Sequence, residues 1–197
     1  MAEHVMSTSR MEAFSDGVVA ILITIMVLEL HAPESVSWQA LRPILPIFLA
    51  YVLSFVFIGI YWANHHHMLQ LADRVNGGIL WANLHLLFWL SLIPFATSWM
   101  GEHPRAIAPT ALYGTVLLCS GAAYTILQHA LIREQGPHSR LAVAVGRDAK
   151  GLLSVGIYVV AIVSAFHSPA LSQLLYLGVV LVWLIPDRRI ENALRER

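Results

Sequence analysis

The chain has 197 residues, of which 57% are hydrophobic and only 12% are charged, and its formal net charge is zero. An average soluble domain is about 25% charged, so this composition excludes an ordinary soluble protein and indicates one that crosses the membrane several times. The balanced charge gives no basis for a nucleic-acid-binding surface, and the single cysteine, Cys119, excludes an intramolecular disulfide.

Six apolar segments separated by polar residues predict an all-α membrane fold. Each segment approaches the roughly 20 residues that a helix needs to cross about 30 Å of hydrocarbon. We therefore expect one six-helix transmembrane domain over residues 1–197, with no separate soluble domain. The predicted spans are residues 14–31, 44–63, 78–99, 109–132, 150–166 and 169–186.

The first segment places a carboxylate before an aliphatic helix. Asp16 precedes the run from Val18 to Leu30, and such a side chain must face protein or water, so it marks a functional or assembly site. At about 100° per residue, Ile21, Thr24 and Leu28 lie on one narrow stripe. Copies of this helix around an axis would form two apolar rings with a hydroxyl ring between them, and hydrophobic rings can gate a pore by dewetting. Periodicity alone favours simple packing for such a stripe.

The second and third segments carry further intramembrane polar residues. Asp16, His65 and Asn83 lie near the same end of their predicted spans, so we expect them to meet at one depth and set the angle of the first helix. Consecutive histidines at His65, His66 and His67 point about 100° apart and cannot converge on one metal ion. We therefore expect no metal site here, and we assign these rings a structural or proton-sensing role.

The later segments supply topology. Only His167, Ser168 and Pro169 join the fifth and sixth segments, which predicts a tight helical hairpin. Arg42 and Arg105 are the two basic residues expected on the outer side. The excess on the other side predicts that both termini are cytoplasmic, in the plasma membrane. That excess comprises Arg10, Arg74, Arg133, Arg140, Arg147, Lys150, Arg188, Arg189, Arg195 and Arg197.

A seven-residue pattern, R-x-x-x-F-S-D, opens the first segment, and shorter patterns follow it. It is formed by Arg10, Phe14, Ser15 and Asp16, and the downstream matches are Trp62 with His65, Asn83-Leu84 and Pro94-Phe95. Together with Thr24 and Leu28, these residues resemble the signature of the transmembrane protein 175 family of potassium channels. The resemblance covers about the first hundred residues, and the last three segments match only in number and hydrophobicity.

The resemblance implies a function and an assembly. A one-repeat member forms a homotetramer in membrane lipid, conducts K⁺ in preference to Na⁺ through a pore lined by the first helix of each subunit, and has no resident cofactor. Position by position, Ile21 matches the hydrophobic constriction, Thr24 the hydroxyl that contributes to selectivity, and Leu28 the next pore-facing turn. The polar network between the first three segments corresponds to Arg10, Asp16, Trp62, His65 and Asn83.

Two other functions compete with a potassium channel. A proton-permeable channel or a proton-coupled transporter would use Asp16 and the histidines as a relay. An intramembrane enzyme is disfavoured because the histidines lack a nucleophile motif and a metal-ligand spacing. Glu29 stays open between a cation-concentrating vestibule and a carboxylate at headgroup level.

Overall fold

The computed structural model describes residues 8–146 and 148–184. The last two residues of the predicted sixth span lie outside these ranges. So do both chain termini and the basic residues Arg147, Arg188, Arg189, Arg195 and Arg197.

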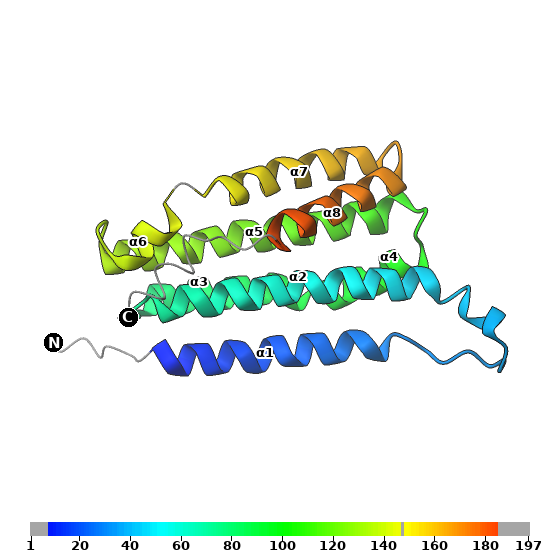
Figure 1. The fold of residues 1–197 in the computed structure, drawn as a ribbon, viewed down its shortest axis with the longest axis horizontal. Coiled ribbons are helices and arrows are strands. Elements are labelled where there is room, and N and C mark those ends of the chain that lie inside the picture. Colours follow the sequence, from blue (N-terminus) through cyan, green and yellow to red (C-terminus); the bar gives the residue numbers. More distant parts are fainter. Residues whose placement is uncertain (1–7, 147, 185–197) are drawn as a thin grey trace.

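Six rod-like segments run antiparallel to one another in chain order (Figure 1). The third rod consists of two helices, α3 and α4, and a short helix, α6, precedes the fifth rod. The helices are α1 (Thr8–Leu28), α2 (Leu45–Gln70), α3 (Gly77–Ser91), α4 (Ile93–Glu102), α5 (Ile107–Gln135), α6 (Arg140–Val145), α7 (Ala149–Ala165) and α8 (Pro169–Leu184), with a 3₁₀ turn η1 (Trp38–Leu41) between α1 and α2.

Helix lengths divide the rods into two groups. Within residues 8–146 and 148–184, four segments are long and apolar enough to cross a bilayer: α1, α2, the combined α3 and α4, and α5. The described parts of α7 and α8 have 17 and 16 residues, which at about 1.5 Å per residue is short of the roughly 30 Å of hydrocarbon. The all-α fold is thus confirmed, with four candidate spans and two shorter apolar helices.

The long helices extend farther than hydropathy predicts at one end of the bundle, where α1, α3 and α7 begin and α2, α5 and α8 end. We call this the amino end. There α1 starts at Thr8 rather than at residue 14, and α2 continues to Gln70 rather than stopping at 63. Polar residues such as Asp16 and His66 are therefore inside helices and bond to neighbouring helices instead of ending their own.

Pro94 divides the third rod. The helix α3 ends at Ser91, and α4 begins at Ile93 with Pro94 in its first turn. Proline cannot donate a backbone hydrogen bond and its ring clashes with the preceding turn, so the helix breaks just before it.

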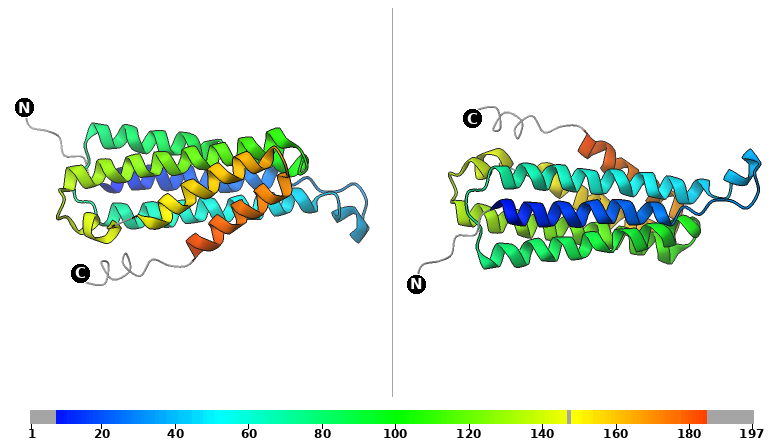
Figure 2. Two further views of the ribbon diagram at one scale, coloured as in Figure 1. Left: turned by 90° about the horizontal axis from the view of Figure 1, so that it is seen from above. Right: turned by 90° about the horizontal axis from the view of Figure 1, so that it is seen from below.

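The helix α1 lies at the side of the bundle. It packs against α2, α3 and α4, and seen from below it lies between α2 and the rod formed by α3 and α4 (Figure 2). On the opposite side, α7 and α8 form the predicted hairpin, with Pro169 as the first residue of α8. One face of α1 is consequently left without a partner among the described helices.

Candidate functional site: the first helix and its polar contacts

The two faces of α1 differ in burial. Its packed face repeats every three or four residues, as expected of a helix that contacts a bundle along one stripe. About 120° or more around the helix from the middle of this face, Ile21 and Leu28 are 57% and 72% exposed, and Thr24 is also exposed. The predicted pore stripe is therefore the side of α1 that faces away from its own subunit. The packed face consists of Met11, Ser15, Val19, Leu22 and Met26.

Thr24 has the geometry of an outward acceptor. Its hydroxyl group bonds to the carbonyl oxygens of Ala20 and Ile21, at 3.1 and 2.9 Å, within the same helix. Because the proton is used in these backbone bonds, the hydroxyl oxygen has lone pairs free to face away from the helix. Such an oxygen can replace part of the hydration shell of a cation.

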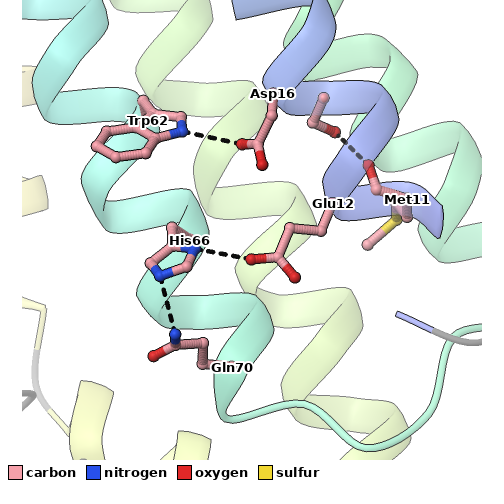
Figure 3. A network of polar contacts seen from close by, with 7 residues as sticks. Met11, Glu12, Asp16, Trp62, His66 and Gln70 are labelled. Atoms are coloured by element: carbon pink, nitrogen blue, oxygen red, sulfur yellow. Dashed lines mark hydrogen bonds and ion pairs between the residues drawn. The ribbon is translucent and has the colours of Figure 1, made fainter. Parts of the chain in front are cut away.

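Asp16 is held by the second helix. The indole N–H of Trp62 donates to Asp16 Oδ1 at 2.9 Å, and Figure 3 shows the two side chains pointing toward each other from α1 and α2. A hydrogen bond to an ionised acceptor is stronger than one between neutral groups. This contact fixes α1 against α2 about two turns inside the helix.

A second carboxylate of α1 repeats the arrangement one turn away. Glu12 Oε1 lies 2.7 Å from His66 Nδ1, and His66 Nε2 lies 2.8 Å from Gln70 Nε2 (Figure 3). The His66 ring stacks on Trp62 with 5.9 Å between ring centroids. Glu12 thus pairs with His66 and Asp16 with Trp62. The two carboxylates are four residues apart on α1, and their two partners are four residues apart on α2. Sequence reasoning missed Glu12 and Gln70.

Asn83 of α3 joins the remaining predicted residues. Its amide nitrogen donates to Ser15 Oγ at 2.9 Å, and its oxygen lies 2.8 Å from His65 Nε2. Ser15 in turn donates to the carbonyl oxygen of Met11 at 2.8 Å. Ser15, His65 and Asn83 are all buried, so this chain ties α1, α2 and α3 together in the core.

Three other residues lie apart from these contacts. Within the described ranges, the exposed side chain of Arg10 has no bond to the network, and Phe14 is exposed beside the Ile21 stripe. Glu29 Oε2 accepts a hydrogen bond from Ser98 of α4 at 2.9 Å, which turns its carboxylate toward its own bundle. This favours a local role for Glu29 over a vestibule.

A different polar cluster lies in the core between α2, α4 and α5. Ser54 Oγ is 2.6 Å from Thr97 Oγ1 and 2.8 Å from the Tyr113 hydroxyl, and Thr97 donates to the carbonyl oxygen of Ile93. We call Ser54, Thr97 and Tyr113 the hydroxyl cluster. It contains no ionisable carboxylate or histidine.

Comparison with known proteins identifies the family. The profile of the endosomal/lysosomal potassium channel TMEM175 matches residues 10–94, which include α1, α2 and α3. A potassium channel of Chryseobacterium sp. (strain P1-3) is 54% identical over 191 residues, covering 97% of this chain and 100% of that protein.

More distant relatives are also TMEM175 proteins. The endosomal/lysosomal proton channel TMEM175 of Homo sapiens is 24% identical over 195 residues, covering 91% of this chain and 38% of the human protein. The fold also matches the crystal structure of a lysosomal potassium-selective channel TMEM175 homologue from Chamaesiphon minutus, with a TM-score of 0.76, 27% identity, and coverage of 91% of this chain and 97% of that one. This chain therefore belongs to the TMEM175 family of ion channels.

Proposed function

We propose that this chain is one subunit of a potassium-selective cation channel, in which four copies surround a pore lined by α1. The family is one of ion channels and not of enzymes. Relatives from Chryseobacterium and Chamaesiphon minutus are described as potassium channels, which supports K⁺ as the permeant ion. Potassium is the substrate in this proposal, and no cofactor or resident metal takes part.

The exposed face of α1 is the observation that carries the proposal. From Gly17 to Leu28 this face is aliphatic apart from Thr24, and it lies on the helix at the side of the bundle. One helix cannot enclose a pore, but copies related by a closed rotation can, because each presents the same stripe to the axis. We therefore assign the pore to Ile21, Thr24 and Leu28.

The order of these side chains supports a gating mechanism. Rings of Ile21 and Leu28 would form apolar constrictions that close by losing water, whereas the Thr24 oxygens would stabilise a partly dehydrated K⁺. The bonds of Asp16, Ser15 and Glu12 to α2 and α3 would hold the helix at the angle that sets the pore radius. In this account Trp62, His65 and Asn83 are positioning residues without contact to the ion.

The same proposal includes six spans with both termini in the cytoplasm of the cell, in the plasma membrane. The shorter helices α7 and α8 would cross by local thinning of the bilayer around them. Among the described basic residues, Arg74, Arg133 and Lys150 lie at the amino end of the bundle, and Arg42 and Arg105 lie near the other end. That asymmetry supports a cytoplasmic amino end.

A proton-permeable channel is the second candidate, and a specific contact favours it over the transporter. The animal relatives are described as proton channels, and the Glu12, His66 and Gln70 side chains form a hydrogen-bonded row beside α1. Such a row could carry protons between the pore helix and the amino end. Glu12→Gln would then lower a proton current and leave the potassium current intact, whereas in a pure potassium channel there is no proton current to lower.

Reversal potentials in liposomes test the proposal. Purified protein is reconstituted with opposing K⁺ and Na⁺ gradients, and wild type is compared with Thr24→Ala and Ile21→Ala. We expect a potassium-directed potential, weaker discrimination against Na⁺ in Thr24→Ala, and greater leak in Ile21→Ala because the constriction widens.

Matched controls come from α5, which packs against α3, α4, α7 and α8. Thr115 is exposed there and its hydroxyl bonds to the carbonyl oxygen of Ala111 at 2.9 Å, so Thr115→Ala repeats the chemistry of Thr24→Ala. Ile126 is 50% exposed, close to the value for Ile21, so Ile126→Ala is the second control. If the control variants alter permeation as much as the α1 variants do, α1 is not the pore helix.

A further inference from the structure

A cavity lies on the far side of the bundle from the exposed face of α1. It is bounded by α2, α5, α7 and α8 near the amino end, and it encloses about 530 Å³, including its open mouth. Aromatic rings form much of its wall, among them Phe57, Tyr61, Tyr124, Tyr158 and Trp183.

Tyr158 gives this cavity an unsatisfied polar group. The residue is only 3% exposed, and within the described ranges its hydroxyl has no hydrogen-bond partner. The other two tyrosines differ, because Tyr61 bonds to the carbonyl oxygen of Leu117 at 3.5 Å and Tyr124 to that of Asn64 at 3.3 Å. No side-chain oxygen that is fully sealed from solvent lacks a partner in this part of the chain, so the Tyr158 hydroxyl faces open space. Tyr158 is one of the residues that line this cavity.

A carboxylate lies at the rim. Asp148 caps the first turn of α7, where its Oδ1 accepts the Gly151 N–H at 2.8 Å, and it also lines the cavity. A Cβ at Gly151 would collide with this carboxylate in its present position, so the glycine allows the close approach. The Asp148 charge is thereby fixed at the mouth while its second oxygen is not needed for the cap.

One of the lining rings, Trp183, already has an ammonium group over its face. Lys150 Nζ lies 6.0 Å from the centroid of the Trp183 ring, and Trp183 is fixed by its indole N–H, which donates to Ser154 Oγ at 2.8 Å. Aromatic faces attract cations through the ring quadrupole. The cavity therefore combines cation-attracting rings, a fixed carboxylate and an unsatisfied hydroxyl.

We propose that this cavity binds a primary ammonium group on a short apolar stem. The ammonium would donate one hydrogen bond to the Tyr158 hydroxyl and lie within the field of Asp148, and the stem would contact the rings of Phe57 and Tyr61. A neutral alcohol of the same length lacks the charge, and a free alkali cation lacks the stem. The ammonium can come from a free amine or from the headgroup of an ethanolamine lipid.

Calorimetric titration of the purified protein with n-butylammonium chloride tests the proposal, and n-butanol is the neutral control. We expect saturable butylammonium binding that butanol does not reproduce. Tyr158→Phe keeps the ring and removes only the unpartnered hydroxyl, so it should weaken binding about tenfold without lowering thermal stability. Asp148→Asn retains the helix cap and removes the charge, so we expect a loss of about three- to fivefold at this half-exposed position.

Two controls make the outcome decisive. Tyr113→Phe removes a hydroxyl elsewhere in the core and Thr24→Ala alters the proposed pore, and both should bind butylammonium as wild type does. Equal binding of butanol and butylammonium, or unchanged affinity in Tyr158→Phe, would overturn the proposal. Neither result bears on conduction, so the site and the channel function are tested separately.

Nanodiscs distinguish the two sources of the ammonium group. At high salt, which screens the lipid charge, the protein is compared in phosphatidylethanolamine and in phosphatidylglycerol discs. Weaker butylammonium binding in phosphatidylethanolamine, with the difference lost in Tyr158→Phe, identifies the lipid headgroup as a competing occupant. Equal affinity in the two lipids identifies free amines as the ligand class.

Discussion

Two groups of buried polar contacts serve the same bundle in different ways. The contacts of α1 to α2 and α3 include two carboxylates and two histidines, and the outer members are partly exposed, as Trp62 is at 45%. The hydroxyl cluster of Ser54, Thr97 and Tyr113 is neutral and fully enclosed. Each group joins three helices of the bundle.

The difference indicates that the two groups of contacts have different roles. Neutral hydroxyl groups satisfy one another in an apolar interior at little cost, so the hydroxyl cluster stabilises a fixed arrangement of α2, α4 and α5. Ionisable groups are costly to bury and respond to protons and salt, so their concentration beside α1 suits the gating movement that we propose for this helix. The predictions below separate stability from conduction on this basis.

The largest loss of stability is expected for Asn83→Leu. This variant removes the bonds of Asn83 to Ser15 and His65 in the core, and we expect unfolding in detergent to become easier by about 1.5–3 kcal/mol. Asn64→Leu is the matched control, because Asn64 bonds to the carbonyl oxygen of Ile60 in its own helix. Equal destabilisation by the two variants would contradict the role of Asn83 as the link between three helices.

Tyr113→Phe should cost less, about 1 kcal/mol, because Ser54 keeps its bond to Thr97 and the ring still packs on Tyr176. Thermal unfolding measures this change. The reversal potential and open probability should equal those of wild type. A marked change in gating would show that the hydroxyl cluster is not merely structural.

Trp62→Phe should change gating and leave stability almost unaltered, which is the reverse of the result expected for Tyr113→Phe. Trp62 is half exposed, so losing its bond to Asp16 should cost less than about 0.5 kcal/mol of stability. Because that bond positions α1, we expect a changed open probability in single-channel recordings. Trp81→Phe, at a tryptophan of α3 that is 74% exposed, is the control and should leave gating unaltered.

Glu12→Gln is expected to have the smallest effect on stability, a few tenths of a kcal/mol, because both Glu12 and His66 are partly exposed. The glutamine keeps an acceptor for His66 but removes the charge. The small difference from wild type should shrink further in 0.5 M salt, where the Debye length is only a few ångströms. A difference that persists at high salt would mean that the bond is not chiefly electrostatic.

The sequence predicted the elements better than their contacts. Hydropathy located the six apolar segments, because the hydrophobicity of a segment is a local feature of the sequence. Hydropathy placed the start of α1 six residues too late. Polar residues such as Glu12 lie inside the helix because their side chains bond to other helices.

The hydrogen-bond partners within the polar network could be assigned only from the three-dimensional structure. Depth alone could not show that Asn83 contacts Ser15 and His65 while Asp16 contacts Trp62. A usable signal was present for the missed residue, because Glu12 and Asp16 are spaced by one turn, as are Trp62 and His66. When two adjacent helices each carry polar residues one turn apart, each residue of one helix can bond to the residue at the same level of the other.

Accessibility of α1 in the working channel tests the central claim most directly. In a Cys119→Ser background, single cysteines are introduced as Thr24→Cys, Leu28→Cys and, for control, Ile126→Cys, and potassium current is recorded while a charged thiol reagent is applied from each side. The account predicts that modification at the two α1 positions blocks the current and that modification at the α5 position does not. Reagent-insensitive current in both α1 variants, with the thiols shown to be modified, would contradict a pore lined by this helix.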